Sequence, residues 1–254
     1  LPCTPAEIVV SAIEAWHEGA SIAHCHTRGA NGERIYDKTM FTEIKAGIES
    51  QTDLIVNLTT SYYPPMTQDQ RFEVLELQPE MASFNSGSLN FGDLGIYENS
   101  PAFMKKMAEQ MLEYNVRPEF EIFDVGQIGN ITRLIEQGLF KPPYLFQFVM
   151  GPKGAMPADA ELLSLAVRML PPQSQWLAIG VGRKQLEMNA LSILWGGHPR
   201  TGFEDNVFYQ KGEIATSNAQ LVARVKRLAL ELGRPVATPT QARAMLGLTT
   251  QKTA

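Results

Sequence analysis

The feature that most constrains the fold is the regular alternation of short apolar runs with helix-forming segments such as 103–114 and 160–170. Most of the apolar runs are continuous, which is typical of parallel strands that are covered on both faces. This order predicts an α/β protein built from strand–helix units. The predicted strands are residues 21–26, 54–60, 80–84, 119–124, 144–150, 175–181 and 190–196.

A helix is predicted ahead of the first of these strands. Thr4 and Glu7 have the spacing of a capping box, Pro5 suits the first helical turn, and Gly19 ends the segment. Seven strands in this order fit a (β/α)8 TIM barrel, which needs eight strands to close. We expect a single barrel domain over residues 1–254, with its first strand missing from this sequence because that strand lies upstream of Leu1.

Composition excludes several classes of protein. The 254 residues are 44% hydrophobic and 19% charged, as in an ordinary globular protein. A net charge of −5 without a basic block argues against a nucleic-acid partner. The two cysteines are too few for a disulfide framework, which favours a cytoplasmic location. No run approaches 18 apolar residues and no targeting peptide is visible, so we expect no membrane partner.

The tripeptide His24-Cys25-His26 closes the first predicted strand. Successive strand residues face opposite sides, so the two histidines project from one face about 7 Å apart, with Cys25 on the other. Two imidazoles at that separation can bind one transition-metal ion. The alternative is a pair of structural histidines.

A second polar constellation, residues 196–206, follows the last predicted strand and contains Arg200, Glu204 and Asp205. Loops at the carboxyl ends of barrel strands form the active sites of such folds. A carboxylate from this loop could complete a site of two histidines and one acid that leaves positions open for substrate. The alternative is a polar loop with a capping acid.

Segments along nearly the whole chain carry a family resemblance through their order and their placement at strand ends. They are residues 23–28, 57–60, 79–83, 87–92, 119–124, 147–151, 197–206, 217–222 and 237–239. With these segments the chain resembles the β-keto acid cleavage enzymes, a family of zinc-dependent (β/α)8 barrels.

The resemblance implies a role for each matching residue. His24, His26 and Glu204 match the zinc ligands of the family. Asp205 matches its general base, and Arg200 matches the arginine that pairs with that base and helps to hold the substrate.

Three further positions match less closely. Glu121 falls on the fifth-strand acid near that pair, which makes it a candidate catalytic residue. Thr60 and Ser83 lie where the family places substrate-binding hydroxyls. A glutamate that the family carries on its first strand has no counterpart in this sequence.

The implied reaction is a reverse Claisen condensation with exchange of acyl groups. A β-keto acid and acetyl-CoA, the co-substrate, become acetoacetate and a new acyl-CoA, with Zn2+ as the cofactor. The resemblance also implies a homo-oligomer, a tetramer or larger. Phe84, Tyr62, Tyr63 and Phe203 suggest a partly apolar substrate pocket.

Two other functions fit parts of the sequence. An amidohydrolase-like metal-dependent hydrolase also displays two histidines on a barrel strand, but it needs further histidines on later strands. The chain has four histidines, and the other two are His17, on a helix, and His198. A non-catalytic barrel that binds an acid ligand is the second alternative.

Overall fold

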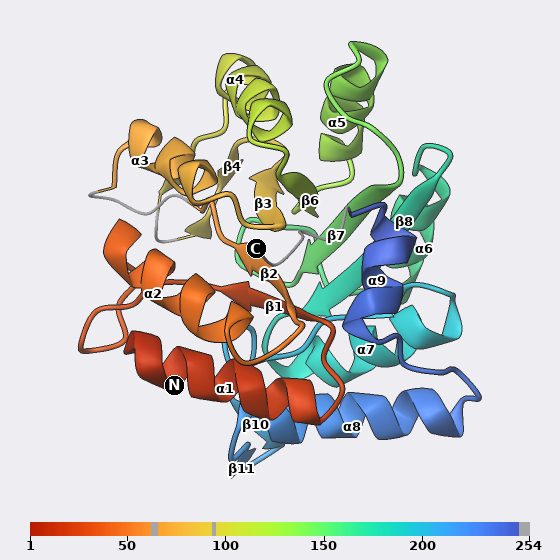
Figure 1. The fold of residues 1–254 in the computed structure, drawn as a ribbon. Coiled ribbons are helices and arrows are strands. Elements are labelled where there is room, and N and C mark those ends of the chain that lie inside the picture. The colour runs from red at the N-terminus through yellow and green to blue at the C-terminus, as the bar shows by residue number, and fades with distance from the viewer. Residues whose placement is uncertain (62–65, 93–94, 249–254) are drawn as a thin grey trace.

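The computed structural model describes residues 1–61, 66–92 and 95–248. A curled, parallel sheet forms its centre and helices cover the outer face of that sheet (Figure 1). Seven strands pair in the order of the chain. They are β1 (Ile22–Cys25), β2 (Ile55–Leu58), β3 (Met81–Asn85), β6 (Arg117–Ile122), β7 (Tyr144–Met150), β8 (Ser174–Gly180) and β9 (His198–Pro199).

Helices alternate with these strands, and two short hairpins, β4–β5 and β10–β11, extend from them. The helices are α1 (Pro5–His17), α2 (Lys38–Glu49), α3 (Gln68–Glu73), α4 (Pro101–Glu113), α5 (Gln127–Glu136), α6 (Ala160–Arg168), α7 (Gln185–Leu194), α8 (Asn218–Glu231) and α9 (Pro239–Leu246). The hairpin strands are β4 (Leu89–Asn90), β5 (Ile96–Tyr97), β10 (Phe208–Gln210) and β11 (Glu213–Ile214). The alternation and the curled parallel sheet confirm the predicted α/β barrel class.

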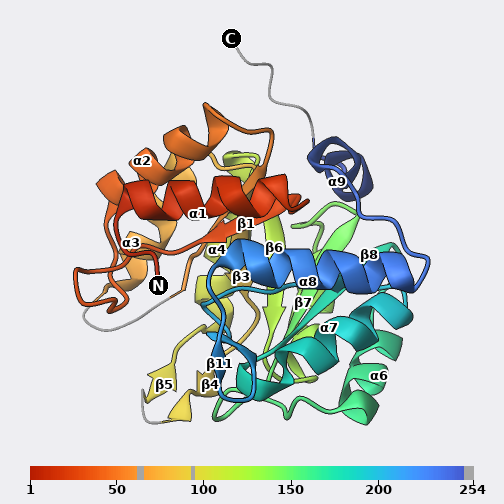
Figure 2. The same cartoon turned by 90° about the horizontal axis from the view of Figure 1, so that it is seen from below.

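The first helix begins as predicted. The hydroxyl of Thr4 accepts from the backbone N–H of Glu7, the Glu7 carboxylate accepts from the backbone of Thr4, and Pro5 is the first helical residue. α1 lies beside α8, so segments from the two ends of the chain are neighbours (Figures 1 and 2). This contact brings β1 near the loops that follow β9.

The predicted strand 190–196 is wrong, because most of it belongs to helix α7. Met188 and Ser192 are buried four residues apart, whereas Leu194 is 58% exposed. This spacing is that of a helix with one covered face, and a short apolar run cannot be assigned to helix or strand from its composition. The last strand of the sheet is instead β9, inside the polar segment that follows.

Within the described chain, β1 and β9 are the two edges of the sheet and are not paired with each other. A cavity of about 890 Å³ lies along this seam, between the two edge strands and helices α1, α8 and α9. Its lining is mostly apolar and includes His24 and Arg200. The candidate site therefore opens onto a deep interior space.

Strand alternation divides β6 between the core and the barrel interior. Phe120 is fully buried and its ring packs against Phe84, Phe140 and Phe146, with ring centroids 4.7 to 5.7 Å apart. Phe84 is thus part of this core and not of a substrate pocket. The residues on either side of Phe120 point the opposite way, toward the interior of the barrel.

No helix of the described residues combines the length and the apolar character that crossing a membrane requires.

Replacement of Phe120 by alanine is expected to lower the free energy of unfolding by about 3–5 kcal/mol, because it leaves a cavity among aromatic rings. Urea denaturation followed by circular dichroism measures the change. Phe208→Ala is the matched control, since that ring is 46% exposed, and its effect should stay within about 0.5 kcal/mol. Equal losses in the two variants would contradict this picture of the core.

Candidate active site

Three side chains from opposite ends of the chain meet at the seam. His24 belongs to β1, His26 follows that strand directly, and Glu204 lies in the loop after β9. The Nε2 atoms of the two histidines are 3.1 Å apart, and Glu204 Oε1 lies 2.6 Å from His26 Nε2. The second carboxylate oxygen lies 3.9 Å from His24 Nε2. One ligand atom from each residue falls within 4.8 Å of the other two.

The donor set fits a small divalent cation. Zinc bonds to histidine of 2.0–2.1 Å in a tetrahedron place the ligand atoms ~3.3 Å apart, close to the separations found here. Burial, followed by the charge of Arg200, lowers the pKa of His24, and burial also lowers the pKa of His26. Both imidazoles are therefore neutral at pH 7, as metal ligands must be.

The loop that carries Glu204 is held from two sides. The side chain of Asn218, the first residue of α8, accepts from the backbone N–H of Phe203 at 2.8 Å and donates to the Ser11 hydroxyl of α1. The amide of Gln185 donates to the carbonyl of Gly202 at 3.0 Å. These bonds fix the acid against the two histidines without help from a ligand.

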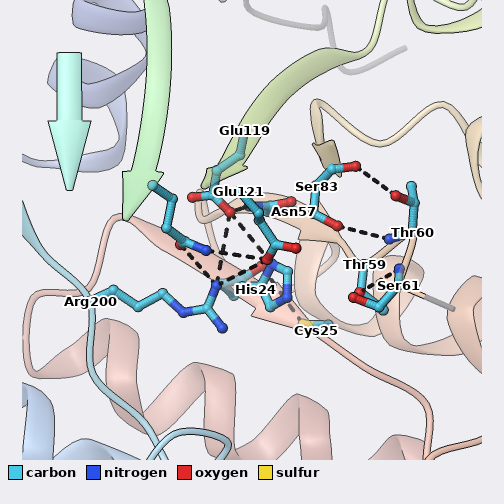
Figure 3. Close-up of polar contacts among 12 residues, drawn as sticks. His24, Cys25, Asn57, Thr59, Thr60, Ser61, Ser83, Glu119, Glu121 and Arg200 are labelled. Carbon is cyan, nitrogen blue, oxygen red and sulfur yellow. Dashed lines mark hydrogen bonds and ion pairs between the residues drawn. The ribbon is translucent and has the colours of Figure 1, made fainter. Parts of the chain in front are cut away.

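Arg200 is the centre of charge in the site (Figure 3). Its guanidinium lies 2.6 Å from Glu204, 3.5 Å from Asp205, 3.9 Å from Glu121 and 4.0 Å from Glu119. Burial opposes its charge, but these carboxylates outweigh burial and raise its pKa. Arg200 therefore stays charged and can offset several acids that would otherwise repel one another.

The acids in the site have different proton affinities. Burial raises the pKa of Glu204, but His26 and Arg200 outweigh it and hold that pKa well below its usual value. Burial raises the pKa of Asp205 to about 7, with Arg200 opposing and Glu204 adding to the rise. Burial likewise raises the pKa of Glu121 to about 8. Groups of this kind can exchange protons near neutral pH.

Thr60 and Ser83 are brought together, but they bond to each other. The Thr60 hydroxyl donates to the carbonyl of Ser83, and the Thr60 backbone N–H donates to the Ser83 hydroxyl. Both residues are fully buried and neither lines the seam cavity. Their predicted contact with substrate stays a prediction. Of the predicted pocket residues, Phe203 lines the cavity, whereas Tyr62 and Tyr63 lie outside the described residues.

Three residues of the site were missed from the sequence. Glu119, two residues before Glu121 on β6, shares its inward face. Gln147 on β7 accepts from Arg200 at 2.9 Å and donates to Glu121 at 3.2 Å. Asn57 lies fully buried on β2, beside Glu119. For Asn57 and Gln147 the signal that could have found them is a polar residue within a continuous apolar run, and for Glu119 it is the position two residues before Glu121 on the same strand face.

Comparison with known proteins gives one consistent result. A family model described as beta-keto acid cleavage enzyme matches residues 1–248. The 3-keto-5-aminohexanoate cleavage enzyme of Fusobacterium nucleatum is 42% identical over 249 residues, covering 98% of this chain and 91% of that protein. The 3-oxoadipate:acetyl-CoA acetyltransferase of Cupriavidus necator is 38% identical, covering 98% and 88%.

Solved structures support the fold. The binary complex of ObcA with oxaloacetate superposes with a TM-score of 0.82 at 22% identity, covering 98% of this chain and 67% of that one. The apo structure of ObcA gives 0.81 at 21% identity, and this chain covers 65% of it. The chain thus spans about two thirds of that protein, and the likeness extends to the fold alone.

Glu121→Gln is expected to flatten the dependence of stability on pH in the metal-free protein. The folded state of the wild type holds a proton on Glu121 up to a pKa of about 8, whereas the unfolded chain loses it near pH 4.5. The stability that this retained proton gives to the folded state is therefore complete below pH 4.5. As the pH rises to 8 it is lost, which lowers the free energy of unfolding by roughly 2–4 kcal/mol.

Urea unfolding of the two proteins between pH 4.5 and 8, after dialysis against a chelator, measures this difference. Glu136→Gln, at the end of α5, is the control and should follow the wild-type curve. Parallel curves for wild type and Glu121→Gln would show that Glu121 titrates normally.

Proposed function

The chain belongs to the β-keto acid cleavage enzyme family, and from that premise we propose that His24, His26 and Glu204 hold a zinc ion beside the catalytic pair Asp205 and Arg200. The protein is an enzyme that cleaves a β-keto acid with acyl transfer involving acetyl-CoA. The observation that carries the proposal is the convergence of three metal-binding side chains with a buried base and a buried cation.

Zinc is the metal that this donor set favours, because catalytic zinc sites use three protein ligands of this kind and keep a further position open. The same ligands also suit iron(II), so metal content decides between the two. Bound there, the ion would act as a Lewis acid on the keto and carboxylate oxygens of the substrate.

Asp205 is placed to act as the general base. Its pKa of about 7 lets it take a proton from the carbon between the keto and carboxylate groups and still release that proton in the same cycle. Arg200, 3.5 Å from Asp205, orients the carboxylate, and its planar guanidinium suits the substrate carboxylate. Glu121, with a pKa of about 8, is protonated at neutral pH and can donate a hydrogen bond to a substrate oxygen.

These groups support an exchange of acyl groups between the β-keto acid and acetyl-CoA. The deprotonated carbon attacks the acetyl carbonyl of acetyl-CoA, and the CoA thiolate leaves. That thiolate attacks the keto carbon of the original substrate. Cleavage of the bond between this carbon and its neighbour then releases acetoacetate and the new acyl-CoA, and the proton held on Asp205 returns to the product carbon.

The amidohydrolase-like alternative receives no support from the remaining histidines. His198 bonds to Gln175 at 3.2 Å, and burial lowers its pKa to about 4. His17 lies at the end of α1. Among the histidines of the described residues, only His24 and His26 join Glu204 in the metal-binding cluster, whereas a binuclear hydrolase site requires more ligands.

We also propose that the protein forms a homo-oligomer of four or more copies, as the family resemblance implies, and that it lies in the cytoplasm, as its two cysteines suggest. Exposed apolar side chains support this assembly. Leu194, which ends α7, and Leu230 on the neighbouring α8 are each more than half exposed.

Glu204→Ala is expected to abolish stoichiometric zinc binding, because it removes the one anionic ligand and leaves two neutral imidazoles. Elemental analysis of purified wild type and variant measures this, with about one zinc per wild-type chain. Glu213→Ala, an exposed acid on β11, is the control and should keep its zinc. Full zinc content in Glu204→Ala would separate the last loop from the metal.

Asp205→Asn is expected to lower kcat by about 10²–10⁴ while zinc content stays unchanged, since it removes the base but no ligand. The kcat/KM of the wild type should fall at acidic pH, where Asp205 takes up a proton. Steady-state assays with β-keto acids and acetyl-CoA measure both quantities. Asp124→Asn, an exposed acid just beyond β6, should behave as wild type.

A further inference from the structure

Two buried polar atoms next to the metal-binding cluster lack hydrogen-bond partners. They are Nδ1 of His24 and Oδ1 of Asn57. The two residues occupy paired positions on the neighbouring parallel strands β1 and β2. A buried polar atom without a partner costs about 1–3 kcal/mol, so two adjacent ones require an explanation.

The nitrogen of the Asn57 side-chain amide is held by a hydrogen bond to Glu119. Its Nδ2 donates to Glu119 Oε2 at 2.8 Å, and that oxygen lies 3.7 Å from His24 Nδ1 (Figure 3). Glu119 is only 3% exposed, and the same oxygen lies 4.0 Å from the guanidinium of Arg200. The amide is therefore oriented with its oxygen left over for the neighbouring imidazole.

The chemistry of a metal-bound imidazole supplies the missing partner. The Nε2 atoms of His24 and His26 converge, so each would bind an ion through Nε2. A neutral imidazole that binds through Nε2 must carry its hydrogen on Nδ1. In His24 this N–H is buried and needs an acceptor, and metal-binding histidines generally have one.

We propose that Asn57 is a positioning residue for the metal site: its amide oxygen accepts the Nδ1–H of His24, and Glu119 fixes the amide through its other end. This chain of three residues selects the tautomer of His24 that presents Nε2 to the ion. The inference rests on the proposed function, because it assigns the support of a metal ligand. It makes β2 and β6 part of the site as well as β1.

Asn57→Leu removes the acceptor with little change in volume, and should weaken zinc binding about 10- to 100-fold. Titration of the metal-free protein in competition with a chromogenic chelator measures the dissociation constant independently of catalysis. Asn189→Leu is the matched control, since Asn189 is as deeply buried but lies on α7, and its zinc affinity should equal that of the wild type.

The outcomes separate this inference from the function on which it rests. Wild-type affinity in Asn57→Leu, or an equal loss in Asn189→Leu, would each overturn the positioning role. Those results would leave the metal site itself intact. Absence of zinc binding by the wild type, or full binding by Glu204→Ala, would instead overturn the proposed function, and the inference with it.

Discussion

The candidate site depends on one buried cation. Arg200 lies within 4.0 Å of four carboxylates, two from β6 and two from its own loop. Buried acids at such separations repel one another and take up protons unless a positive charge offsets them. His26 and Arg200 keep Glu204 charged, whereas burial outweighs Arg200 and raises the pKa of Asp205 and of Glu121. The acid next to the two histidines thus stays charged, while two neighbouring acids can hold protons near neutral pH.

The barrel sheet places these groups through simple alternation. On β6 the side chain of Phe120 enters the aromatic core, while Glu119 and Glu121 on either side of it face inward. On β1, Cys25 packs among the residues of α1 and α2, and His24 faces the cavity. The same strands therefore supply the stability of the fold and the chemistry of the site, on opposite faces.

Much of the fold was accessible from local signals. The capping box at Thr4 and six of the predicted strands appear in the structure, because both depend on spacings of a few residues. Prediction failed at residues 190–196, where an apolar run lies on a helix with one covered face. It also failed for Phe84, whose burial depends on rings from β6 and a distant loop.

For the site, the sequence by itself determined which chemistry was possible: two histidines on one strand face, and an arginine with two acids in one loop. Only the tertiary structure decided that these groups meet, because the contact depends on how a parallel sheet curls and on α1 packing beside α8. It also decided the supporting roles of Asn57, Glu119 and Gln147. A buried polar residue acquires a function only from the partner that a neighbouring strand brings to it, and no local pattern specifies that partner.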